Sequence, residues 1–167
     1  NTDISIYVPV YNGEKTIERC INSVLEQSIK PSNILILNDS SNDNTLEILK
    51  KYEGLIRIKS NKSNLGLSHS RNIAVNELKT RYIASIDADV ELDKNWLEIL
   101  YSSALKNDAT LTGGRMYEKY LNNPFNLWRS LRIGQQWGDK DLNDPNFIFG
   151  CNNILDTERI EKKKIYL

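Results

Sequence analysis

The 167-residue chain is long enough to form one domain with a hydrophobic core. Its 22 basic and 22 acidic residues give a formal net charge of zero, which argues against a broad electrostatic surface for nucleic acid. Its 2 cysteines lie outside any metal-type spacing, and no apolar run has membrane-spanning length or follows a signal-peptide pattern, so we expect a cytoplasmic location.

Strand-like and helix-like segments alternate along the chain as far as residue 116. Short apolar runs predict strands at 4–10, 33–38, 55–59, 81–87 and 109–116. Apolar residues at helical spacing predict helices between them, at 17–27, 44–53, 67–78 and 93–104. We expect Asn12, Asp93 and a capping box of Asn44 with Glu47 to cap these helices. Cys20 falls on the apolar stripe of the first helix, which predicts a buried thiol.

The alternation stops after residue 116. The segment 117–146 contains an amphipathic piece around 125–133. Trp128 and Trp137 either fill the core or form an aromatic platform on which a ligand such as a sugar can stack. A short strand is expected at 147–150 and a last helix from Asp156. The pattern predicts one α/β domain with a Rossmann-like, mostly parallel sheet flanked by helices.

Polar or acidic residues follow each of the first four strands. They are Tyr11-Asn12, Asn38-Asp39-Ser40, Asn64 to Arg71, and Asp87-Ala88-Asp89. Because the carboxyl ends of parallel strands meet at one edge of a sheet, we expect these loops to form a cleft. Two carboxylates spaced one residue apart at this edge suit a divalent cation, which prefers hard oxygen ligands.

Two nucleotide-binding signatures are missing from the chain. There is no GxxxxGK[ST] motif, which excludes a P-loop NTPase, and no GxGxxG motif after the first strand, which argues against a dinucleotide fold. Other readings of the acidic pair remain open. Asp87 and Asp89 could be a helix cap and a solvated loop acid, or could open an EF-hand-like calcium loop, although Leu92 stands where that loop needs glycine.

Four motifs, in this order and spacing, give the chain a resemblance to family 2 glycosyltransferases of the GT-A fold. They are Val8-Pro9-Val10-Tyr11-Asn12-Gly13, the turn from Asn38 to Thr45, Asn64-Leu65-Gly66 with Ser70-Arg71-Asn72, and the Asp87-Ala88-Asp89 triplet, a DXD motif. The resemblance implies a nucleotide-binding part at about 1–112 and an acceptor-side part at about 113–167.

The resemblance also implies roles for individual residues. Pro9, Val10 and Tyr11 would pack against the nucleotide base, and Asp39 would accept a hydrogen bond from the base. Arg71 would face the base or the diphosphate, and Asp87 would reach the ribose or a metal-bound water. Ala88 would also lie at the nucleotide, and Asp89 would bind Mn2+ or Mg2+. Gly113 and Gly114 would leave room for a sugar on the acceptor side.

Two departures from the family pattern concern the second turn and the catalytic base. Asn38 stands where the family usually has a first acidic residue. The acidic motif that holds the base would follow Leu167, so the chain is expected to be truncated there and to bind nucleotide with little transfer. Glu118, Asp139, Asp141 and Asp144 are weak alternatives for the base.

The resemblance implies an inverting, metal-dependent transfer of a sugar from a nucleotide-diphosphate donor, UDP by family habit, to an acceptor hydroxyl, as in polysaccharide biosynthesis. The acceptor could be a glycan, a lipid-linked sugar or a protein, and the chain could associate peripherally with the inner face of the membrane. The alternative function is a non-catalytic nucleotide- or sugar-binding module of the same fold.

Overall fold

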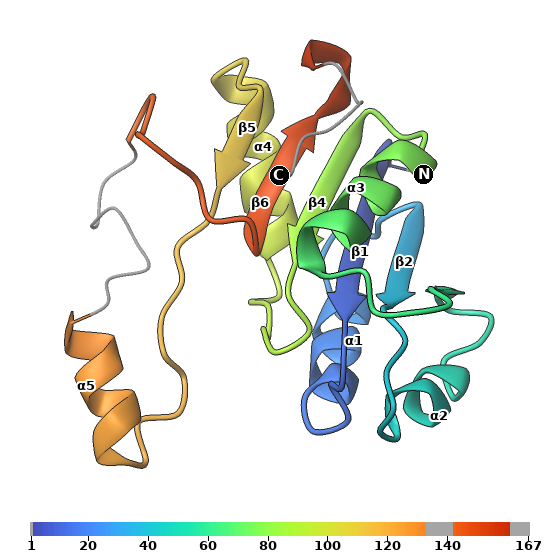
Figure 1. Cartoon of the computed structure of the whole chain (residues 1–167). Helices are drawn as coiled ribbons and strands as arrows, with labels where there is room; N and C mark the ends of the chain where they lie inside the picture. The colour runs from blue at the N-terminus through green and yellow to red at the C-terminus, as the bar shows by residue number, and fades with distance from the viewer. Residues whose placement is uncertain (1, 133–141, 161–167) are drawn as a thin grey trace.

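The computed structural model describes residues 2–132 and 142–160. In this part of the chain, six strands form one sheet in the order β3-β2-β1-β4-β6-β5 (Figure 1). The strands are β1 Ile4–Val10, β2 Asn33–Asn38, β3 Arg57–Ser60, β4 Tyr82–Ile86, β5 Leu111–Gly113 and β6 Asn152–Asp156. The bounds expected for β1 and β2 are confirmed, whereas β3 begins later and β5 is shorter than expected.

The sheet is parallel from β3 to β4, as expected from the alternation of strands and helices. Helices connect these strands and continue after them: α1 Ile17–Leu25, α2 Thr45–Lys50, α3 Leu67–Glu77, α4 Trp96–Lys106 and α5 Pro124–Arg132. β6 is antiparallel to both β4 and β5. The mostly parallel α/β sheet is therefore confirmed, with one reversed strand inserted beside β4.

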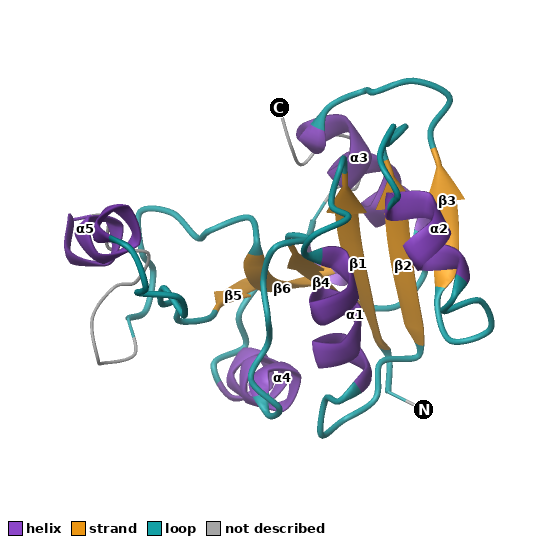
Figure 2. Ribbon diagram, turned by 90° about the horizontal axis from the view of Figure 1, so that it is seen from below, coloured by secondary structure: helices purple, strands orange, loops and turns teal. Residues whose placement is uncertain are grey.

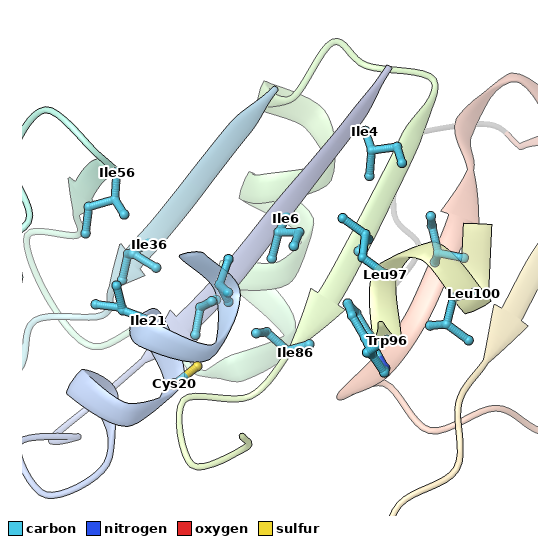
Figure 3. Packing of buried hydrophobic residues seen from close by; sticks show 14 of the residues in the cluster. Ile4, Ile6, Cys20, Ile21, Ile36, Ile56, Ile86, Trp96, Leu97 and Leu100 are labelled. Carbon is cyan, nitrogen blue, oxygen red and sulfur yellow. The ribbon is translucent and has the colours of Figure 1, made fainter. Parts of the chain in front are cut away.

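Helices cover both faces of the sheet (Figure 2). Residues of α1, α2 and α4 belong to one hydrophobic cluster, and residues of α3 belong to a second cluster on the opposite face. Figure 3 shows the first cluster, in which the side chains of α1 and α4 meet those of β1, β2 and β4. Cys20 is fully buried there, as its position on the apolar stripe predicted. Burial of this apolar surface is the main favourable term in folding.

The chain after residue 146 differs from the sequence prediction. Residues 147–150 form no strand, because the strand that pairs with β4 is Asn152–Asp156. Asp156 does not begin a long helix: its carboxylate accepts the Glu158 N–H and caps a single 3-10 turn, Thr157–Arg159. β6 was not predicted at its observed position because it begins with two polar residues, and asparagine is uncommon in strands. Asn152 and Asn153 are nevertheless buried.

α5 stands apart from the sheet, at the end of an extended connection from β5 (Figure 1). None of its residues is buried, and Trp128 is 53% exposed. Of the two alternatives for Trp128, the one in which it fills the core is therefore wrong. Trp137 lies outside the described residues. Among the helices that the structure describes, none has the length and apolarity needed to span a bilayer.

Candidate nucleotide and metal site

The carboxyl ends of β1, β2 and β4 place Tyr11, Asp39 and Asp87 at the same edge of the sheet. Pro9 and Val10 are buried at the end of β1, whereas Tyr11, just beyond it, is 49% exposed. An exposed ring at this edge can stack on a planar ligand, and the base-binding role of Tyr11 stays a prediction.

Hydrogen bonds join the turn after β1 to the turn after β2. Asn12 and Asn44, which were predicted to cap helices, take part in these bonds instead. Asn12 caps no helix: its Oδ1 accepts the Asn42 N–H at 2.9 Å. Asn44 forms no capping box, because its N–H and its side-chain amide both donate to Glu14. The predicted cap at Asp93 is closer to the structure, since Asp93 Oδ1 accepts the Asn95 N–H just before α4.

Asp39 organises the loop that follows β3. Its carboxylate accepts hydrogen bonds from Asn61 Nδ2 at 2.7 Å, from the Gly66 N–H at 2.8 Å and from the Leu65 N–H at 3.0 and 3.2 Å. Gly66 has a φ of 86°, a conformation that favours glycine. Three donors thus engage the two carboxylate oxygens, which offer about four acceptor sites. The contact of Asp39 with a base stays a prediction.

The same hydrogen bonds set the charge of Asp39. Burial would raise the pKa of this carboxyl, but the donors from Asn61, Leu65 and Gly66 outweigh it and hold the pKa below its ordinary value. Asp39 is therefore a buried anion at neutral pH, stabilised by its own chain.

Arg71 and Asp87 come together, although they lie on different elements. Arg71, from α3, donates through Nη2 to Asp87 Oδ1 at 2.6 Å, directly beyond the end of β4. The Arg71 side chain is only 12% exposed, against 32% for Asp87. Ala88 is half-buried and Asp89 is exposed, so the second carboxylate of the triplet faces solvent. The predicted residues of the third and fourth loops thus share one site.

The acids around Asp89 suit a divalent cation that receives further ligands from a substrate. Asp87 and Asp89 offer hard carboxylate oxygens, the ligands that Mg2+ and Mn2+ prefer. Across the two described ranges, no group of three Asp, Glu, His or Cys side chains could hold a metal ion. A cation held here would need further ligands, which Mg2+ commonly takes from substrate phosphates.

The calcium-loop alternative is wrong because its later acids are engaged elsewhere. Glu91 binds Lys119 and accepts the Tyr120 hydroxyl at 2.7 Å, contacts that lower the pKa of Glu91. Glu98 lies within α4 and accepts the Ser28 hydroxyl at 2.8 Å. These carboxylates do not converge on one ion.

Gly113 and Gly114 leave room for side chains of their own chain. A Cβ on Gly113 would lie 2.6 Å from Ile148 Cγ2, and one on Gly114 would overlap Asn152 Oδ1. That Asn152 oxygen accepts the indole N–H of the buried Trp96 at 2.6 Å. This packing gives both glycines a structural role, and their acceptor role stays a prediction.

Two residues near the triplet were missed as site neighbours by sequence reasoning. The Cys20 thiol donates to the Asp87 carbonyl at 3.6 Å, and burial, with Asp89 and Asp87 nearby, raises its pKa to about 12. Burial and Asp87 likewise raise the pKa of Cys151 to about 11. Cys20 was expected only as a buried thiol, and Cys151 lies in Gly150-Cys151-Asn152-Asn153, a stretch that resembles the family pattern but suggested no site role for the cysteine. The fold shows that both thiols approach the acids.

The structure supports none of the four alternative bases. Glu118 is ion-paired with Arg129, and Asp144 lies in a turn with a φ of 59°. Asp139 and Asp141 fall outside the residues that the structure describes. No general base is assigned.

Known proteins share both the sequence pattern and the fold. The family model Glycosyl transferase family 2 matches residues 5–159. Poly(ribitol-phosphate) beta-N-acetylglucosaminyltransferase TarP of Staphylococcus aureus is 37% identical over 117 residues, covering 67% of this chain and 36% of TarP.

Two solved structures are similar in fold at low sequence identity. PcManGT, a mannosyltransferase from Pyrobaculum calidifontis in complex with GDP-Man and Mn2+, has a TM-score of 0.69 at 15% identity, covering 93% of this chain and 45% of PcManGT. TarS of S. aureus in complex with UDP-GlcNAc has a TM-score of 0.60 at 23% identity, covering 73% and 37%. The chain thus spans less than half of each of these three proteins. With the matched model covering nearly all of its residues, this chain belongs to glycosyl transferase family 2 and has the GT-A fold.

Proposed function

We propose that the protein transfers a sugar from a nucleotide-diphosphate donor to an acceptor hydroxyl, with inversion and with a divalent cation at Asp89. The observation that supports this most is the pairing of Arg71 with Asp87 beside an exposed Asp89, at the carboxyl edge of the parallel strands. A cation and an arginine at one edge would offset the charge of a diphosphate, and charge on the leaving group is the main electrostatic demand of the reaction.

We propose a UDP-sugar as donor, with Mn2+ or Mg2+ as the ion. TarS binds UDP-GlcNAc, and PcManGT binds GDP-Man with Mn2+, so the fold accommodates both bases. In this chain, Pro9 and Val10 would pack against the base, and the Tyr11 ring would stack on it. Asp87 would position the ribose, and the exposed carboxylate of Asp89 would be the protein ligand of the cation. When bound, the cation would supply Lewis-acid stabilisation of the diphosphate.

A thermal-shift panel of UDP, GDP and dTDP, each with and without Mn2+, tests this proposal. A ligand at 100 times its Kd stabilises a protein by about 2.7 kcal/mol, or about 5–10 °C for this chain length. We expect one nucleotide to raise Tm only with Mn2+, and Asp89→Ala to abolish the shift. Glu47→Ala, which removes an exposed carboxylate on α2, is the matched control. No shift with any nucleotide would contradict the proposal.

Transfer assays separate the enzyme from a non-catalytic module. An inverting reaction needs a base that deprotonates the acceptor, and we propose that residues 1–167 bind the donor with little transfer. Turnover by these residues alone would place the base among the acids of the chain. Donor binding without transfer by a protein that carries an acidic motif after residue 167 would support the binding-module alternative.

We also propose that α5 docks on an anionic bilayer, because of its exposed face and its charge. Phe125 and Trp128 stack with ring centroids 6.4 Å apart, and Leu131 beside them is 75% exposed. The chain from Lys119 to Arg132 has no acidic residue, and Arg129 and Arg132 lie in the last turn of the helix. Aromatic and leucine side chains bordered by arginine are typical of helices that lie in the membrane interface.

Vesicle flotation tests the docking of α5. We expect the protein to float with vesicles of phosphatidylglycerol and phosphatidylcholine, and the variant Phe125→Ser/Trp128→Ser to stay in solution. Exposed Leu55, which lies far from α5 on the loop before β3, provides the control variant Leu55→Ser. Equal flotation of all three proteins, or self-association through α5 without vesicle binding, would contradict this proposal.

A further inference from the structure

Arg71 lies between Asp87 and the backbone of Gly150. Its Nη2 is 2.6 Å from Asp87 Oδ1, while a Cβ built on Gly150 would lie 2.6 Å from Nη1 and 3.1 Å from Cζ. Any side chain at position 150 would therefore overlap the guanidinium. The positive-φ glycines of the described chain are Gly54 and Gly66, so backbone conformation does not explain glycine at 150. The close approach of Arg71 does.

Buried side chains hold the Gly150 backbone in this position. The Ser85 hydroxyl donates to the Gly150 carbonyl at 2.7 Å, and Asn153 Nδ2 donates to the Phe149 carbonyl at 2.8 Å. Ser85 and Asn153 are 1% and 3% exposed and pair across β4 and β6. Buried hydrogen bonds of this kind are costly to leave unmade, so the turn before β6 is fixed to the sheet.

These contacts connect the turn before β6 to the proposed diphosphate site. Ser85 holds Gly150, Gly150 packs on Arg71, Arg71 pairs with Asp87, and Asp87 follows Ser85 by two residues at the end of β4. The Arg71 side chain is long and flexible, so holding it in one conformation costs conformational entropy. If the Gly150 backbone moved, the guanidinium would no longer be held in its present position.

We propose that Gly150 is a positioning residue for Arg71, and that the turn 149–150 thereby sets the affinity of the site for nucleoside diphosphates. This inference rests on the proposed function and adds a residue to it that touches no substrate. It links the segment before β6 to the site through packing against one guanidinium.

The test compares UDP binding in Mn2+ by the wild-type protein and Gly150→Ala. We expect Gly150→Ala to weaken binding about tenfold, the effect of losing one charge-assisted hydrogen bond. Gly54→Ala is the control: at a φ of 90° it strains the backbone, but a Cβ there meets nothing within 4 Å. We expect it to lower Tm and leave UDP affinity unchanged, which separates stability from positioning.

A double-mutant cycle asks whether Gly150 acts through Arg71. In an Arg71→Met background, we expect Gly150→Ala to cause no further loss of UDP affinity. Binding by Gly150→Ala within about twofold of wild type, or an equal loss in both backgrounds, would overturn the inference. A crystal structure of ligand-free Gly150→Ala tests it even if UDP does not bind. Arg71 displaced from Asp87 supports positioning, and an unchanged pair refutes it, whereas failure of the proposed function would show as absent binding by the wild-type protein.

Discussion

The substitution Asp39→Asn tests whether a buried anion holds the loop after β3. The wild-type carboxylate, 4% exposed, accepts from Asn61 Nδ2 and from the N–H groups of Leu65 and Gly66. Asparagine keeps the shape of the side chain but removes the charge. It also places an amide NH2, a donor, where one carboxylate oxygen now faces N–H donors.

The expected cost follows from these contacts. Hydrogen bonds to charged groups contribute about 1.5–3 kcal/mol each, and their contributions are not additive. Leu65 is exposed and its N–H can turn to water, so we expect Asp39→Asn to lower the free energy of unfolding by about 2–3 kcal/mol and Tm by about 5–10 °C.

The pH dependence gives the stricter test. Because the pKa of Asp39 is lowered in the folded state, its charge stabilises the fold above the unfolded pKa of about 3.9, and this stabilisation is lost as the pH falls through the folded pKa. Urea unfolding of both proteins from pH 7 to pH 3 measures the difference. We expect it to be constant near neutral pH and to shrink below about pH 4. A difference in unfolding free energy under about 0.5 kcal/mol at pH 7, or one that is as large at pH 3 as at pH 7, would refute the reasoning.

Two further predictions concern buried groups near the site. Trp96→Phe removes the indole donor to Asn152 Oδ1 and leaves that buried oxygen unsatisfied, so urea unfolding is expected to show a loss of about 1–3 kcal/mol; a loss no larger than for the exposed Trp128→Phe would contradict this. Because the pKa values of Cys20 and Cys151 are raised to about 12 and about 11, we expect neither thiol to react with Ellman's reagent at pH 8 until urea unfolds the protein. Fast reaction of either thiol in the folded protein would be inconsistent with these environments.

The parallel half of the fold could be predicted from the sequence because its signals are local. β1 and β2 are continuous apolar runs, and the buried residues of α1 and α4 recur at helical spacing. β6 could not be found in this way. It begins with two asparagines that are buried with hydrogen-bond partners. Asn152 accepts from Trp96, which is distant in the sequence, and Asn153 donates to the Phe149 carbonyl, which no sequence pattern marks.

The same distinction applies to the candidate site. Strand ends and polar turns placed Asp39, Asp87 and Asp89 at one edge from sequence alone. The contacts of these residues depend on how side chains meet in the folded chain, and no local sequence pattern shows this. Asp39 proved to bind the loop at 61–66, and the Gly150 contact with Arg71 joins segments that only the insertion of β6 beside β4 brings together.

The nucleotide site that we propose at Asp89 depends on a divalent metal ion. Isothermal titration calorimetry with UDP, in Mn2+ and in EDTA, tests it most directly. We expect saturable UDP binding by the wild-type protein in Mn2+, binding at least about tenfold weaker in EDTA, and the same weak binding by Asp89→Ala under both conditions. Equal UDP affinity in Mn2+ and EDTA, or unchanged metal dependence in Asp89→Ala, would contradict the assignment.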